Sequence, residues 1–126
     1  MDLARKLQLK PGQSISIVNE PANLALDLGR DHPAATDPGN ADAVIVFCTD
    51  RAELDGLRHQ YVPPVARDAL TWVAYPKAGK LGTDLNRDVL AKIVEREAVR
   101  PVRQVALDDV WSALRLRPAG AVRARW

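Results

Sequence analysis

Apolar runs bounded by turn residues predict a set of buried strands along this chain. The run at 43–48 is rich in branched residues, which is typical of a strand buried on both faces of a parallel sheet. Similar runs at 14–18 and 70–75 lie next to proline turns and predict two more strands. We expect the strand at 70–75 to lie at the centre of the sheet.

The last two strand-like runs differ in kind from the first three. Residues 102–107 and 110–116 are joined only through Asp108 and Asp109. This connection is long enough for a hairpin but too short for a parallel crossover. We therefore expect an antiparallel pair, with 110–116 beside the central strand and 102–107 at the edge of the sheet.

Helix signals recur between the strands. Asp2 is suited to cap a short helix at the start of the chain. A second helix is predicted over 22–28, because its alanines and leucines are good helix formers, and Gly29 is expected to end it. The prolines, glycine and aspartates of 30–40 then predict a loop.

Two later helices have clearer start signals. Asp50 and Glu53 form a capping-box pattern that opens a helix, which Pro63-Pro64 is expected to interrupt. The other helix is predicted to begin at a cap formed by Thr83 or Asp84. Its apolar residues recur at helical spacing: Leu85, Val89, Ile93 and Val94.

Composition restricts the class of protein without naming a function. The 126 residues carry a formal net charge of +2, and 47% are hydrophobic, as in an ordinary globular domain. We expect one domain over 1–117 and a basic tail over 118–126. No apolar run approaches the ~20 residues that span a bilayer. The N-terminus has no signal-peptide core, so we expect a cytoplasmic protein without membrane contact. The small charge excess makes nucleic acid an unexpected partner.

Three segments resemble a family of short bacterial proteins catalogued only as a domain of unknown function: LKPGQSISIV, ALTWVAYPKAGKLGTDL and VALDDVWSALRLRP. In expected strand order and terminal hairpin, the chain also resembles a cut-down class I methyltransferase of the S-adenosylmethionine type. The order of elements and this resemblance together imply an α/β fold. We expect a Rossmann-like three-layer sandwich, with a mostly parallel sheet and a C-terminal antiparallel hairpin.

The turn after the first strand lacks the residues that cofactor binding on such a scaffold needs. That turn normally uses glycine for positive φ and for close approach of the backbone to the cofactor. No residue from 19 to 28 is glycine. We therefore expect the usual cofactor site to be closed or changed, and we expect no cofactor.

Ligands of open parallel sheets collect beyond the carboxyl ends of the strands. The polar residues expected there form the candidate ligand-binding set: Asn19, Asp50, Lys77, Lys80, Asp108 and Asp109. Lys77 beside one of these carboxylates could pair with it, act as a general base or bind an anion. The alternative is a hydrogen-bonded rim that only holds loops. The loop at 77–83 leaves the same choice between anion binding and turn formation.

Other reactive residue types fit structural roles. Cys48 is expected to be a buried, reduced thiol, because no motif links it to His32 or His59. No close spacing of histidine, cysteine and carboxylate residues suggests a metal. Trp72 and Trp111 are expected to fill the core.

These observations favour a non-catalytic regulatory or interaction module on a degenerate methyltransferase-like scaffold, with a protein partner or a second copy of the chain. The alternative is a binder of a small anion or nucleotide-type ligand, or an enzyme, using Lys77, Asp108 and Asp109 at the carboxyl edge of the sheet. Whether these side chains face one pocket distinguishes the two hypotheses.

Overall fold

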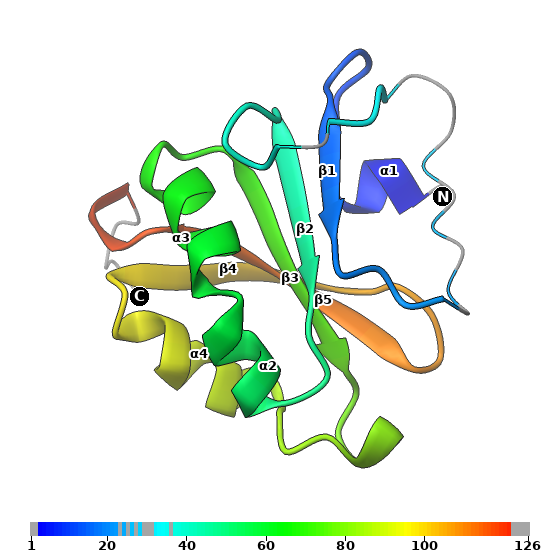
Figure 1. Cartoon of the computed structure of the whole chain (residues 1–126), viewed down its shortest axis with the longest axis vertical. Coiled ribbons are helices and arrows are strands. Elements are labelled where there is room, and N and C mark those ends of the chain that lie inside the picture. Colours follow the sequence, from blue (N-terminus) through cyan, green and yellow to red (C-terminus); the bar gives the residue numbers. More distant parts are fainter. Residues whose placement is uncertain are drawn as a thin grey trace.

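A five-stranded sheet forms the centre of the computed structural model, which describes residues 3–22, 24, 26, 28, 32–35 and 37–121 (Figure 1). The strands are β1 (Ile15–Val18), β2 (Ala43–Phe47), β3 (Leu70–Pro76), β4 (Val99–Ala106) and β5 (Trp111–Pro118). Their order across the sheet is β1-β2-β3-β5-β4. The predicted central strand, hairpin and edge strand are therefore confirmed.

The strand directions correct one expectation. β1, β2 and β3 pair in parallel, whereas β5 is antiparallel to both β3 and β4. The sheet is therefore mixed, with two parallel and two antiparallel pairings, and is not mostly parallel. The cause is the short turn after β4, which forces β5 to return antiparallel, and β5 then inserts between β3 and β4. As a result, β1 to β4 all point the same way.

The described helices are short. They are α1 (Leu3–Lys6), α2 (Arg51–Gly56), α3 (Arg58–Ala66) and α4 (Arg87–Glu95), with 3-10 turns at Lys80–Gly82 and Ala119–Ala121. None of these is long and apolar enough to cross a membrane. The proposed Asp2 cap and most of the basic tail lie outside the described residues.

Apolar residues alternate between the two faces of the sheet and form two cores. On one face Val44 and Val46 pack with residues of α2, α3 and α4, which lie together on that side in Figure 1. On the other face Ile45 packs with Leu7 and Trp72, and the Trp72 Nε1–H donates to the Leu7 carbonyl at 3.0 Å. This second face carries only α1 among the described helices, so the three-layer sandwich stays a prediction.

The predicted helix at 22–28 is wrong at the residues that the structure describes there. Leu24, Leu26 and Leu28 are not helical, and all three are half-buried against the second core. Their spacing of two residues differs from the spacing of three or four that places side chains on one face of a helix. Burial of the leucines outweighs the weak helix preference of the segment.

The expected break at Pro63 and Pro64 is also wrong, because both prolines lie inside α3. The break falls earlier, at Leu57, where α2 ends and α3 begins. Two interior prolines cost the helix backbone hydrogen bonds. Tyr61 and Val65 are fully buried against the sheet, and this burial compensates for the loss.

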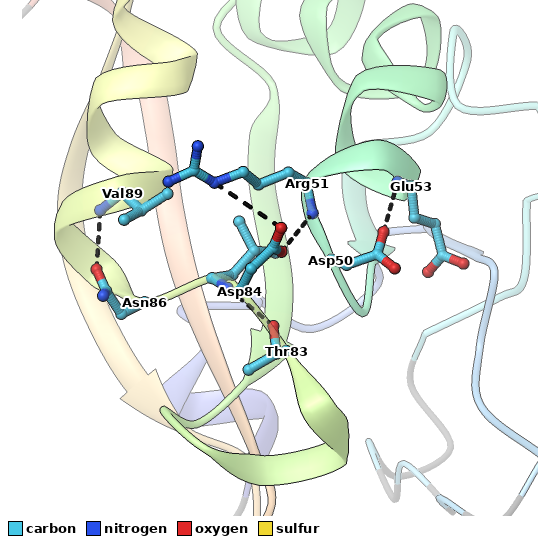
Figure 2. A network of polar contacts seen from close by, with 8 residues as sticks. Asp50, Arg51, Glu53, Thr83, Asp84, Asn86 and Val89 are labelled. Carbon is cyan, nitrogen blue, oxygen red and sulfur yellow. Dashed lines mark hydrogen bonds and ion pairs between the residues drawn. The ribbon is translucent and has the colours of Figure 1, made fainter.

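The cap of α4 lies two residues later than the nearer predicted cap. Asn86 is the N-cap, and its Oδ1 accepts from the Val89 N–H at 2.9 Å (Figure 2). Thr83 Oγ1 instead accepts from the Leu85 N–H, and Asp84 Oδ1 accepts from the Arg51 N–H at the start of α2. Thr83 thus binds a backbone group of its own loop, whereas Asp84 binds the first residue of α2.

Candidate ligand-binding site

The carboxyl ends of β1 to β4 lie at one edge of the sheet, because these four strands point the same way. The candidate residues follow these ends: Asn19 after β1, Asp50 after β2, Lys77 and Lys80 after β3, and Asp108 and Asp109 after β4. Their expected placement along one edge is confirmed. Residues at one edge of a sheet need not line the same cavity, and only some of these six residues do.

A cavity of about 440 Å³ opens at this edge. Its lining combines apolar, amide, hydroxyl and carboxylate side chains: Asn19, Glu20, Pro21, Leu24, Phe47, Thr49, Glu53, Leu81, Asp108, Val110 and Trp111. Of the six candidates, Asn19 and Asp108 line the cavity. Asp50, Lys77, Lys80 and Asp109 do not.

Asn19 holds the turn after β1 in the conformation that glycine usually supplies. Its φ is 60°, in the left-handed region that asparagine tolerates better than most residues. Its Nδ2 group donates to the Phe47 carbonyl at 2.9 Å and to Glu53 Oε1 at 3.0 Å. The side chain therefore ties the ends of β1 and β2 to α2, in the space that a glycine turn would leave open.

Glu53 and Asp50 fix the start of α2. Asp50 Oδ1 accepts from the Glu53 N–H at 2.8 Å, as a helix cap does (Figure 2). Glu53 Oε1 accepts from the Thr49 N–H at 2.8 Å and is 3.3 Å from Thr49 Oγ1. The capping-box signal was correct, but the carboxylate of Glu53 also reaches the cavity, which the pattern alone did not indicate.

Asp108 also has two roles, because it holds the β4–β5 turn and lines the cavity. Its Oδ1 accepts from the Val110 N–H at 2.8 Å and from the Trp111 N–H at 2.7 Å. Such bonds within a tight turn are typical of aspartate. Asp109, its exposed neighbour, does not line the cavity. Asp108 thus shapes the hairpin and places a carboxylate at the cavity wall.

The lysines of the loop after β3 hold backbone turns. The Lys77 N–H donates to the Val110 carbonyl at 2.7 Å, and the Lys80 N–H donates to the Lys77 carbonyl at 2.8 Å. Gly79 and Gly82 have φ values of 81° and 66°, so these glycines are needed for the backbone turn. The turn interpretation of this loop has direct support, and Leu81 from the same loop lines the cavity.

Two aromatic residues are among those that line the cavity. Phe47 and Trp111 pack edge to face, with ring centroids 5.3 Å apart and an interplanar angle of 78°. Both residues are buried, which confirms Trp111 as a core residue. Three acidic residues also line the cavity: Glu20, Glu53 and Asp108. No lysine or arginine is among the described lining residues. The wall is therefore part aromatic and part acidic.

Cys48 lies just behind this wall, at the end of β2. It is fully buried, and its Sγ–H lies 3.6 Å from the Ala74 carbonyl. Burial raises the pKa of the thiol to about 12, and the charges of Glu53 and Asp50 add to the shift. The expectation of a buried cysteine is confirmed, and a thiol with this pKa is a poor nucleophile at neutral pH.

The remaining chemistry-bearing residues are spread out. His32 lies against the Gln13 carbonyl at 3.2 Å, whereas His59 is exposed on α3. In the part of the chain that is described, no group of three or more histidine, cysteine, aspartate or glutamate residues could hold a metal ion. A larger cavity of about 920 Å³ runs along β1 as far as its carboxyl end, and Glu20 lines both cavities.

Comparison with known proteins bears on the fold. No family model matches the chain, and no curated protein matches it. A crystal structure described as a protein in the NADB-Rossmann superfamily from Streptococcus agalactiae is similar to it, with a TM-score of 0.55. The match covers 94% of this chain and 70% of that chain, at 10% sequence identity. It shows a Rossmann-like α/β fold, and the resemblance to a short bacterial family stays a prediction.

Proposed function

We propose that this chain is a non-catalytic regulatory or interaction module on a degenerate methyltransferase-like Rossmann scaffold, with a small ligand bound in the carboxyl-edge cavity. One observation carries the proposal. Three polar side chains of the cavity wall hold its loops: Asn19 bonds the end of β2, Glu53 bonds Thr49, and Asp108 bonds its own turn. Groups used in this way form a stable binding surface rather than a set poised for proton transfer.

The methyltransferase-like part of the proposal rests on strand arrangement. The last strand lies antiparallel between β3 and β4, and this terminal hairpin is the feature of the resemblance. Asn19 now occupies the turn in which such a scaffold needs glycine. We therefore expect no useful affinity for S-adenosylmethionine. Calorimetry that finds a dissociation constant of ~10 μM or tighter, about 7 kcal/mol, would contradict this expectation.

The cavity wall favours a particular ligand chemistry. Aromatic rings attract organic cations and apolar groups, and carboxylates accept hydrogen bonds from ammonium donors. Trp111 supplies the first property, and Glu20 and Asp108 supply the second. We infer a compact ligand with an apolar body and an amine or ammonium group.

The alternative of an anionic or nucleotide-type ligand has less support at this cavity, because its described charged groups are acidic. That alternative depends on Lys77 and Lys80 in the neighbouring loop. If it holds, Lys77→Ala should abolish binding of inorganic phosphate and change stability by at most ~1 kcal/mol. Binding of phosphate that persists in this variant would remove Lys77 from the hypothesis.

The test of the preferred ligand class compares two carboxylates. Glu20 lines the cavity, whereas Asp109 is exposed outside it, so Glu20→Gln and Asp109→Asn remove the same charge at different places. A thermal-shift screen with primary amines and tetramethylammonium should raise the unfolding midpoint of the natural protein. We expect Glu20→Gln to weaken this effect and Asp109→Asn to preserve it. Equal loss in both variants would indicate a diffuse charge effect and would contradict the site.

A further inference from the structure

The β4–β5 hairpin carries four arginines that the cavity does not use. Arg100 is directly opposite Arg117 in the strand register, and Arg103 is directly opposite Arg115. Arg115 and Arg117 alternate along β5 with residues of the first core, so they lie on the second face of the sheet, the face that α1 covers. We call these four residues the arginine face.

Among the described residues, most of the positive charge on the arginine face has no acidic partner. Within the described residues, its only ion pair joins Arg117 to Asp68, with Nε–Oδ1 at 3.0 Å and Nη2–Oδ2 at 2.6 Å. Arg115 Nη1 donates to the neutral Gln8 Oε1 at 2.6 Å, and Arg115 Nε is buried with no hydrogen-bond partner in the part of the chain that is described. Desolvation and the charges of Arg117 and Arg103 lower the pKa of Arg115.

Protection of the sheet edge explains only part of this arrangement. β4 is an edge strand, and Arg100, Arg103, Pro101 and the irregularity after Pro101 all hinder pairing with another chain. β5, however, is paired on both sides, so Arg115 on that strand has no edge to protect. Like charges directly opposite across strands also destabilise a sheet. A bound anion would remove that cost.

We propose that the arginine face binds a di- or polyphosphate group. The planar guanidinium fork matches the oxygens of a phosphate and binds them in pairs. Arg115 and Arg117 are two residues apart on one strand, a Cα separation of about 7 Å, which suits adjacent phosphates rather than a single one. Among the described residues, the acidic group that pairs with the face is Asp68, and Arg117 already engages it.

The test is calorimetric titration of the full chain with inorganic tripolyphosphate at fixed ionic strength. Arg103 is exposed and has no ion pair among the described residues, so Arg103→Gln removes a binding group without breaking a scaffold contact. Arg96→Gln is the matched control, since Arg96 is exposed at the end of α4, which packs on the other face. We expect Arg103→Gln to weaken binding by about tenfold and Arg96→Gln by less than about twofold.

Three results would overturn the proposal. The first is no binding of tripolyphosphate by the natural protein. The second is equal binding by the natural protein and by both Arg103→Gln and Arg100→Gln. The third is loss of binding in a double variant of the tail, Arg123→Gln with Arg125→Gln, while the hairpin variants bind normally. A DNA duplex is titrated in parallel, and binding of the duplex without binding of tripolyphosphate also counts against the proposal.

Discussion

Replacing Asn19 by alanine is expected to lower the free energy of unfolding by about 2 kcal/mol, and replacing it by glycine by about 1 kcal/mol. Both variants lose the hydrogen bonds from Nδ2 to the Phe47 carbonyl and to Glu53 Oε1. At this partly exposed position each bond contributes about 0.5 kcal/mol. Only alanine adds strain, because a φ of 60° costs it about 1 kcal/mol more than it costs glycine.

Urea unfolding at pH 7 measures both values, and the thermal midpoint of the glycine variant should exceed that of the alanine variant by about 4 °C. Asn40 supplies the control pair. It is also exposed and bonded to a carboxylate, Asp37, but its φ is not positive. Glycine at position 40 should therefore be no better than alanine. If Asn19→Ala is as stable as Asn19→Gly, asparagine is not substituting for glycine in this turn, and the account of the closed cofactor site is wrong.

Three other side chains give sharp expectations. Because burial raises the pKa of Cys48 from 9.0 to about 12, the free energy of unfolding should fall as pH rises above about 9. A thiol reagent should react with Cys48 only when the protein unfolds. Rapid reaction of the native protein would refute this. Arg117 holds the pKa of Asp68 below 3.8, so the pair stabilises the fold above about pH 4 and is lost as pH falls further. Asp68→Asn should cost under ~1 kcal/mol at pH 7, and an equal cost at pH 2 would exclude the ion pair as the cause. Tyr61 has a buried hydroxyl with no partner among the described residues. Tyr61→Phe should therefore leave the free energy of unfolding unchanged or raise it by about 1 kcal/mol. A clear loss of stability in chemical denaturation would show that the hydroxyl has a hydrogen-bond partner.

The sequence predicts the sheet well because its signals are local and strong. The continuous apolar run of β2 reports burial on both faces, and this follows from the chain alone. The hairpin follows from a connection too short for a crossover, so the antiparallel direction of β5 was derivable. Insertion of β5 between β3 and β4 also agreed with the expected order.

The errors arise where tertiary burial decides the outcome. Leu24, Leu26 and Leu28 suit a helix by composition, and only their spacing of two indicates that one side of the segment covers the second core. At the candidate site, Glu53 shows the same limit of prediction from local sequence patterns. Its capping role is a local pattern, whereas its contact with Asn19 joins residues 34 positions apart in the chain. No local rule specifies such a contact.

Opposite charges gather at two different parts of this sheet. The acidic cavity lies beyond the carboxyl ends of β1 to β4, whereas Arg117 bonds Asp68, which precedes the first residue of β3 and so marks the amino ends. Arg115 lies opposite Trp72 and the cavity residue Trp111 lies opposite Pro76, so four residues of β3, or about 13 Å, separate the nearest parts of the two regions. This distance exceeds the Debye length of about 8 Å at physiological salt, so the two proposed sites should bind their ligands with little influence on each other. A net charge of only +2 therefore averages over an acidic region and a basic region of the same sheet. Composition reports only the sum of the charges, so it could not indicate either region.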